Sequence, residues 1–198
     1  MPSKTFLNLP KEKKVKFIKQ SLIEFSNYQL KDASINRIIK SCDIARGSFY
    51  QYFKDINDLY HYIFEISFEK LEDSFEEILE KTKDLSKTFI LFYDTFITYG
   101  SKKSNKDYFE NVFRNATTVS IQEYYNKKKQ EYIGKIIQNI DKKSINKSSK
   151  ENFLYSLELI YYEVIHSATK YFIYNESKKL NESIFKKNID ILLKKITN

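Results

Sequence analysis

The stretch Ser34–Phe53, SINRIIKSCDIARGSFYQYF, decides the fold expected for this chain. Its first half carries apolar residues at the i, i+3, i+4, i+7 spacing of one helix face: Ile35, Ile38, Ile39 and Cys42. A second helical period follows: Arg46, Phe49, Tyr50 and Phe53. Between them lies Asp43, and Asp is one of the few non-glycine residues that tolerate a left-handed backbone. Two short helices joined by such a turn predict a helix-turn-helix.

The second half of this stretch also resembles a known family. The run Ile44–Lys54, IARGSFYQYFK, with Leu59 five residues later, is similar to the recognition segment of TetR-type regulators. The resemblance covers about residues 11–65 and departs from the family pattern at two positions. Asp43 stands where the family usually has Gly, and Ile39 where a small residue is common.

The fold class follows from composition and from this resemblance together. Only three Gly and two Pro among 198 residues favour long helices with few tight turns. We therefore predict an all-α chain of about nine helices. The resemblance implies a three-helix DNA-binding domain over residues 1–54 and a helical ligand-binding and dimerisation domain over residues 55–198.

Helical periodicity places most of the expected elements. We predict a loose arm over residues 1–9 and a first helix from Lys11 with Val15, Ile18, Leu22 and Phe25 on its apolar face. Later helices are expected over 55–81, 85–100, 106–116, 119–140 and 151–175, and from about Asn181 with that residue as its cap. Residues 141–150, rich in Lys, Ser and Asn, are expected to form an exposed loop.

The positive charge of the chain is concentrated at one end. Residues 1–54 contain eleven Lys or Arg and four Asp or Glu, a net of +7, whereas the other 144 residues carry a net of only +1. A general enrichment in lysine would have spread the excess evenly. Charge confined to the segment with the helix-turn-helix predicts a nucleic-acid interface there.

Position by position, the resemblance implies which residues contact DNA. The main set lies on or next to the second helix of the motif: Arg46, Gly47, Ser48, Tyr50, Gln51, Tyr52 and Lys54. Three residues at the start of the first helix are added to it: Ser34, Asn36 and Arg37. Arg suits this role because its planar guanidinium binds a guanine edge or a phosphate with two hydrogen bonds. Phe49 and Phe53 are expected in the core.

Catalytic and metal-binding functions find little support. The two histidines, His61 and His166, lack metal-ligand spacing to each other or to Cys42. Neither a Gly-rich phosphate loop nor a nucleophile elbow is present. We expect no enzyme activity, no cofactor and no metal, and a structural role for Cys42. A lone cysteine, and the lack of a signal peptide or membrane span, lead us to expect a cytoplasmic protein without membrane contact.

Polar residues within apolar helical runs suggest an effector site. The resemblance implies a pocket in the second domain, and candidate residues for it are Asp94, Arg114, Tyr155, Glu158, Tyr162 and His166. An aromatic-lined pocket favours a largely apolar or aromatic small molecule. The alternative places Tyr155, Glu158, Tyr162 and His166 on an exposed or intersubunit edge.

The last two helices are too apolar for an isolated surface. The resemblance implies that they pair with a second copy to form a four-helix homodimer interface. Its expected residues are Leu157, Tyr161, Val164, Ile165, Ala168, Phe185, Ile189 and Leu192.

Together these features predict a sequence-specific, homodimeric transcriptional regulator that binds a double-stranded DNA operator. The resemblance favours a repressor released by the small-molecule effector. The alternative is a helical protein of the same fold that acts as a ligand carrier or coactivator without binding DNA.

Overall fold

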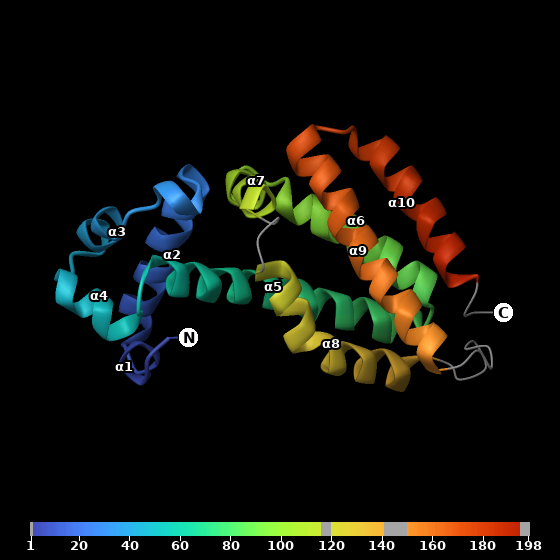
Figure 1. Ribbon diagram of the computed structural model, residues 1–198, viewed down its shortest axis with the longest axis horizontal. Coiled ribbons are helices and arrows are strands. Elements are labelled where there is room, and N and C mark those ends of the chain that lie inside the picture. Colours follow the sequence, from blue (N-terminus) through green and yellow to red (C-terminus); the bar gives the residue numbers. More distant parts are fainter. Residues whose placement is uncertain (1, 116–119, 141–149, 195–198) are drawn as a thin grey trace. The chain divides into compact units, whose positions relative to one another are not determined.

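The computed structural model describes residues 2–115, 120–140 and 150–194, and these parts form ten α-helices and one 3₁₀ turn without a strand (Figure 1). In chain order the elements are α1 (Lys4–Leu7), α2 (Lys11–Asn27), η1 (Leu30–Asp32), α3 (Ile35–Cys42), α4 (Arg46–Tyr52), α5 (Ile56–Thr82), α6 (Leu85–Gly100), α7 (Lys106–Asn115), α8 (Ser120–Asn139), α9 (Lys150–Tyr174) and α10 (Lys178–Leu193). The all-α prediction is confirmed. The expected loop over 141–150 lies outside the described residues, apart from Lys150 at the start of α9.

The chain divides into two compact units, and the division does not follow the sequence order. The first unit contains residues 1–69 and 103–120, and therefore includes α1–α4, the first part of α5 and all of α7. The second contains residues 70–102 and 121–198. Helix α5 passes from one unit into the other without a break. The functional boundary after Lys54 stays a prediction.

An aromatic cluster forms the core of the first unit. The ring of Phe17 on α2 stacks on that of Phe53 with centroids 5.8 Å apart, and Phe6 meets Phe53 edge-on at 4.8 Å. Phe49 and Leu59 are also fully buried, and the core positions expected for Phe49 and Phe53 are confirmed. Aromatic pairs of this kind contribute beyond the area they bury.

Two expectations for the N-terminal region are wrong. Residues 4–7 form a short helix rather than a loose arm, because Ser3 caps it and Phe6 enters the core. The buried face of α2 is also rotated from the expected one, since Phe17, Ser21, Glu24 and Phe25 are buried while Val15 is 55% exposed.

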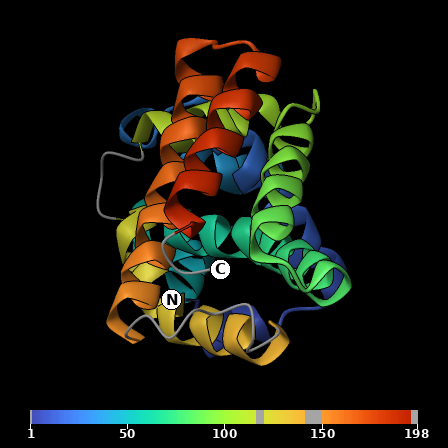
Figure 2. The same cartoon turned by 90° about the vertical axis from the view of Figure 1, so that its right-hand side faces the viewer.

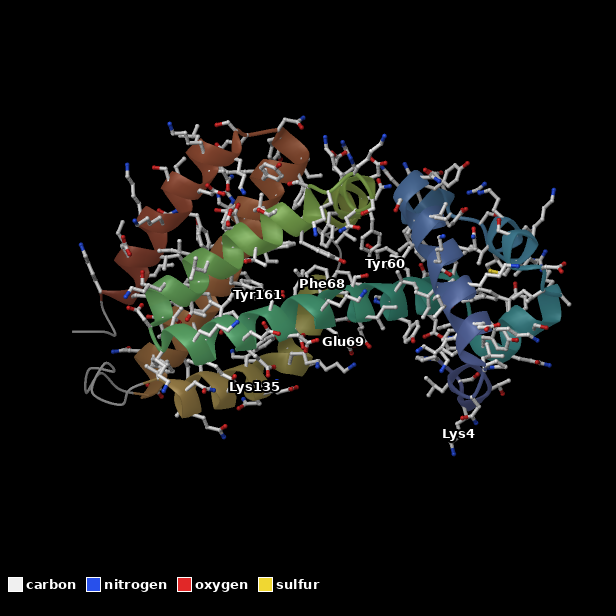
Figure 3. The ribbon with its side chains drawn as sticks, turned by 180° about the vertical axis from the view of Figure 1, so that it is seen from behind. Lys4, Tyr60, Phe68, Glu69, Lys135 and Tyr161 are labelled. Atoms are coloured by element: carbon white, nitrogen blue, oxygen red, sulfur yellow. The ribbon has the colours of Figure 1, made fainter. Side chains whose placement is uncertain are left out.

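Helix α7 belongs to the first unit through α2. The side-chain amide of Asn111 donates to the backbone oxygens of Phe25 and Ser26 at 3.1 and 2.9 Å, and so satisfies carbonyls near the C-terminal end of α2. Phe109 on α7 lies 6.3 Å from the ring of Phe68 on α5. Figure 3 shows Tyr60 and Phe68 on this part of α5.

In the second unit, α9 and α10 lie side by side, and α10 also packs on α6 (Figure 2). A polar network joins the three helices. The Tyr93 hydroxyl donates to Oδ1 of Asn181, whose amide nitrogen donates to the backbone oxygen of Ser167 at 3.0 Å and to Glu176 at 2.7 Å. Asn181 is therefore buried inside α10, and Ser177 caps that helix in place of the expected Asn181.

Helix α8 is held to its neighbours in this unit by lysine side chains. Lys135, labelled on α8 in Figure 3, pairs with Glu76 on α5, and Lys128 lies 3.3 Å from Glu72 on the same helix. Lys129 forms a 2.7 Å ion pair with Glu158 on α9. These three contacts fix α8 against two different helices by charge rather than by apolar packing alone.

Candidate nucleic-acid interface

The turn of the helix-turn-helix is built around Asp43, as the sequence predicts. Asp43 has a φ of 57° and a ψ of 50°, a left-handed conformation. Its amide donates to the carbonyl of Lys40 at 3.3 Å, and the amide of Ile44 donates to that of Ile39 at 3.1 Å. This pair of bonds is the Schellman arrangement that ends a helix and redirects the chain. The turn therefore sets how α4 leaves α3.

Helix α4 presents the expected contact residues on its open side. Arg46, Gly47, Tyr50 and Gln51 are exposed, while Phe49 in the same helix is fully buried. Ser48 and Tyr52 are half-buried. One face of α4 is thus anchored in the core, and the other is open to a ligand.

Arg46 meets the preceding helix through Asn36. Its Nη1 donates a hydrogen bond to Oδ1 of Asn36 at 3.2 Å, and both side chains are exposed. The bond joins the first turns of α3 and α4. These two predicted contact residues therefore occupy one continuous surface.

Gly47 has no structural reason to be glycine within the chain. Its φ is not positive, and a Cβ atom built on it would meet nothing within 4 Å. Glycine in a helix lowers stability relative to alanine. A partner whose surface comes close to the α4 backbone would explain the residue.

The C-terminal end of α4 is held by the N-terminal segment. Ser3 donates from its hydroxyl to the Gln51 carbonyl at 2.6 Å and from its amide to the Tyr52 carbonyl at 3.0 Å. The Tyr52 ring packs against Phe6 at 5.7 Å and Phe17 at 6.0 Å. Tyr52 is therefore partly a core residue. The sequence signal for this contact was the apolar group Phe6, Leu7 and Leu9 just before Pro10.

Lys54 lies just before α5, where carboxylates already bind backbone amides. The Lys54 amide donates to Oδ2 of Asp58 at 3.0 Å, and the Asp58 amide donates to Oδ1 of Asp55 at 2.8 Å. These acidic caps satisfy part of the helix start on which a phosphate could otherwise bind. The Lys54 side chain itself is exposed and remains a predicted contact.

Arg37 differs from the other predicted contacts, because it is bound within the protein. Its Nε lies 3.0 Å from both carboxylate oxygens of Glu24, and its Nη2 lies 2.6 Å from Oε1. The Glu24 carboxylate raises the pKa of the Arg37 guanidinium. Ser34, the remaining predicted residue, is half-buried and donates its amide to Glu24 at 2.7 Å.

Cys42 is buried at the end of α3, and burial raises the pKa of its thiol. The buried position predicted for this side chain is thereby confirmed. Among the residues that the structure describes, no three His, Cys, Asp or Glu side chains come together as a metal site. Within the same residues, no helix combines the length and hydropathy needed to cross a bilayer.

The expected effector residues are not enclosed. Tyr155 and Tyr162 are 64% and 42% exposed, and His166 is exposed on the same face of α9. Glu158 is ion-paired with Lys129, as described above. Tyr155, Tyr162 and His166 thus lie on an open edge of the helix, whereas Glu158, the fourth residue of the alternative interpretation, is half-buried.

The other two candidates lie in different units. Asp94 is exposed on α6 and forms a 2.7 Å ion pair with Lys178 of α10, which lowers the pKa of its carboxyl. Arg114 is exposed on α7 in the first unit. The two therefore do not form one site within a single unit.

Most of the residues expected at the dimer interface lie in the core of one chain. These are Leu157, Val164, Ala168, Phe185 and Ile189, each at most 8% exposed. Tyr161, Ile165 and Leu192 are half-buried. The cause is that α9 and α10 already bury their most apolar faces against each other and against α6.

A different set of side chains on these helices is exposed. Tyr155, Tyr162 and His166 lie on α9, and Leu180 and Ile191 lie on α10, where they are 52% and 59% exposed. Their spacings of seven and eleven residues place those of each helix on one face. We call this set the open α9/α10 residues. The sequence already indicated the part of this face that lies on α9, because Tyr155, Tyr162 and His166 are polar residues at helical spacing within an apolar run.

Comparison with known proteins identifies the fold and the family. A sequence model described as the tetracyclin repressor-like C-terminal domain matches residues 84–195. A search among curated proteins gave no match. Three solved structures show the fold. A transcriptional regulator from Cytophaga hutchinsonii has a TM-score of 0.64 at 17% identity, covering 92% of this chain and 97% of that one.

The other two are regulators of the TetR family. One, from Streptomyces coelicolor, has a TM-score of 0.63 at 12% identity over 93% of this chain and 80% of that chain. The other, from Marinobacter aquaeolei VT8, has a TM-score of 0.56 at 14% identity over 94% and 96%. The family match extends over more than half of the residues. The chain belongs to the TetR family of transcriptional regulators.

Proposed function

We propose that this TetR-family regulator binds a specific double-stranded DNA operator through α3 and α4, and that it is a repressor released by a small effector. The observation that carries the proposal is the arrangement of α4. Its buried side is fixed by Phe49, and its open side presents Arg46, Gly47, Tyr50 and Gln51. A helix of this size fits the major groove, where Arg and Gln side chains distinguish base edges.

Charge supports the same assignment. The net of +7 over residues 1–54 lies in the unit that carries α3 and α4. Figure 3 shows Lys4 on α1 with its side chain directed away from the helices of this unit. Because Glu24 is internally paired with Arg37, one of the four acids there presents little charge to a phosphate backbone. Lysine contacts to phosphates supply affinity, whereas base contacts supply specificity.

We infer that two copies associate through α9 and α10 by the open α9/α10 residues. Exposed Tyr, Leu and Ile side chains at helical spacing are the composition expected of an interface core. A twofold dimer would present two α4 helices to two half-sites about one DNA turn, ~34–36 Å, apart or somewhat more.

We propose that the effector binds among the helices of the second unit and is largely apolar or aromatic. Aromatic side chains pack between the helices of this unit. The ring centroid of Phe75, for example, lies 5.3 Å from that of Phe89 and 5.3 Å from that of Phe92. Effector and operator then antagonise each other equally, typically by ~1–3 kcal/mol. The chain passes between the two units three times, and helix α5 makes the first of these connections.

The test is selection of a duplex from a random pool by the wild-type protein, followed by titration of that duplex by fluorescence anisotropy. We expect tight binding that Arg46→Ala weakens by about 1–3 kcal/mol. Leu91→Ala, a matched exposed substitution in the second unit, should bind as the wild type does. Absence of any selected sequence, or equal binding of the selected duplex by wild type and Arg46→Ala, would refute DNA recognition through α4.

A further inference from the structure

We propose that Arg37 is a positioning residue that fixes the start of α3 through Glu24, and that it does not itself contact DNA. The inference rests on the proposed DNA binding and reassigns one of the residues that the family resemblance places on the operator. It follows from where the hydrogen-bonding edge of the guanidinium is directed.

That edge is already used. Arg binds a phosphate or a guanine most tightly with two parallel hydrogen bonds from a fork of N–H groups. In this chain the fork of Nε and Nη2 is bound to the Glu24 carboxylate at 3.0 and 2.6 Å. Nη2 also donates to the backbone oxygen of Asp32 at 2.7 Å. To bind DNA with this edge, Arg37 would have to leave both Glu24 and Asp32.

The position of the guanidinium is fixed on a second side by an aromatic ring. Its central carbon lies 3.8 Å from the centroid of the Tyr28 ring, a cation–π contact. Tyr28 is the C-terminal cap of α2, and Asp32 is the last residue of η1. Arg37 therefore gathers the end of α2, the turn and the first turn of α3 around one side chain.

Glu24 needs this partner. It is 5% exposed, and a buried carboxylate is costly unless it is paired and its oxygens accept hydrogen bonds. Besides Arg37, its Oε1 accepts the amide of Ser34, the residue just before α3. Through these bonds the carboxylate on α2 holds the start of α3, where Asn36 meets Arg46. Glu24 itself is enclosed and cannot reach a duplex.

This arrangement separates two effects that usually coincide. Replacing Glu24 by Ala removes a negative charge from the DNA-binding unit, and electrostatics alone would strengthen binding to DNA. Positioning requires the opposite result, because α3 loses the group that holds it. The control is Asp43→Asn, which removes an acid from the same unit while Asn keeps the left-handed turn.

The experiment measures binding to the selected duplex as a function of salt for wild type, Glu24→Ala, Glu24→Gln, Arg37→Ala, the double variant, Asp43→Asn and Lys54→Ala. We expect Glu24→Ala and Arg37→Ala each to weaken binding roughly tenfold or more, and the double variant to bind no more weakly than either. The slope of log affinity against log salt should stay at the wild-type value in both. Lys54→Ala, a direct phosphate contact, should lower it by about 1. Asp43→Asn should bind as tightly as wild type or more tightly.

A local measurement accompanies it on the free protein. Hydrogen exchange of the Ser34 amide should accelerate in Glu24→Ala and Arg37→Ala, while amides in the middle of α9 keep their wild-type rates. Circular dichroism establishes whether each variant is folded. If Glu24→Ala does not fold, Glu24→Gln, which keeps the volume of the side chain, replaces it.

The outcomes are distinguishable. Unchanged or tighter binding by the Glu24 variant, together with a slope reduced by about one in Arg37→Ala, would overturn the inference while leaving DNA recognition intact. Failure of the wild-type protein to bind any duplex would remove the proposed function and the DNA-related part of the inference together. In that case unchanged Ser34 exchange would also refute the anchoring of α3.

Discussion

Arg46 on α4 donates a 3.2 Å hydrogen bond to the side-chain oxygen of Asn36 on α3, and both residues are open to solvent. The two helices of the motif thus share a polar contact on their solvent-exposed side. A guanidinium held by a neighbouring amide oxygen loses less freedom when it binds, because part of its rotamer choice is already made.

This contact predicts an unequal pair of substitutions. Arg46→Ala should weaken binding to the selected duplex by about 1–3 kcal/mol and relax specificity at one base pair, if Arg46 reads a base edge. Asn36→Ala should cost less, and the double variant should lose less than the sum because the two side chains act together. Anisotropy titrations on matched and mismatched duplexes measure both. Strictly additive losses would show that the hydrogen bond has no part in recognition.

The salt dependence of binding provides a second prediction. If about six Lys, Arg or amide groups contact phosphates, log affinity should fall against log salt with a slope near −5. Lys54→Ala should weaken all sequences about equally and reduce that slope by about 1. Lys187→Ala, an exposed lysine on α10, is the control and should leave the slope unchanged. Affinity that does not respond to salt would contradict the assignment of the basic unit as the binding surface.

Gly47 predicts opposite changes in stability and affinity. Gly47→Ala should raise the free energy of unfolding by up to about 1 kcal/mol, because the site has room for a Cβ and no positive φ. The same methyl group should weaken DNA binding if the duplex approaches the α4 backbone. Gly134 in α8 has equal room, so Gly134→Ala should give the gain in stability alone. Urea denaturation and anisotropy separate the two effects. Full DNA affinity in Gly47→Ala would mean that no partner comes close at this point.

The open α9/α10 residues predict which substitutions dissociate the dimer. Tyr162→Glu and Ile191→Glu should shift the protein to monomer in analytical ultracentrifugation while leaving its circular dichroism unchanged, since neither side chain belongs to the core of one chain. Leu157→Glu should instead unfold the chain, because that side chain is 6% exposed. Val15→Glu, at an exposed position of α2, is the control. Dimers that persist in both Tyr162→Glu and Ile191→Glu would place the interface elsewhere.

Tyr93 predicts a loss of stability at high pH. Burial raises the pKa of its hydroxyl, whereas in the unfolded chain a tyrosine ionises near 10. Above about pH 10 the folded state therefore keeps a proton that the unfolded state loses, and the free energy of unfolding falls as the pH rises. Tyr93→Phe should lose this pH-dependent part. At pH 7 it should cost about 1–3 kcal/mol, because Oδ1 of Asn181 loses its donor in a buried site.

Urea denaturation at about pH 7 and pH 10.5 measures both parts of this prediction. Tyr155→Phe, which changes an exposed hydroxyl on α9, provides the comparison for tyrosine loss in general. An identical pH dependence in wild type and Tyr93→Phe would show that other groups govern stability in this range.

The helices were predictable because their apolar periods are long. The expected helix over 85–100 coincides with α6, and the motif Ile35–Tyr52 has both its turn and its core residues where the sequence indicates. What periodicity missed was polar burial. Glu24 and Ser21 occupy the buried face of α2 because Arg37 and the Phe17 carbonyl satisfy them, so Val15 is left outside.

The same reason applies to two other residues whose partners the sequence did not indicate. Asn181 has the composition of a helix cap, but tertiary hydrogen bonds to Tyr93 and Ser167 hold it in the core. Arg37 is a residue type expected at a DNA contact, and the fold pairs it with Glu24, which lies 13 residues earlier in the chain. Single-residue chemistry indicates which groups can bind a ligand. It does not indicate which of them the fold has already paired.

Helix α7 has a consequence for how this protein can be divided and recombined. The unit that carries α3 and α4 is encoded in two separate segments, Met1–Glu69 and Lys103–Ser120, and α6 lies between them in the sequence. A gene fragment that stops at residue 69 would lack α7. It would lose the hydrogen bonds from Asn111 to the α2 backbone and the Phe109 ring beside Phe68. A chimaera that exchanges operator preference between relatives would therefore have to carry both segments. A single crossover after α4 or within α5 would combine α1–α4 of one relative with α7 of the other.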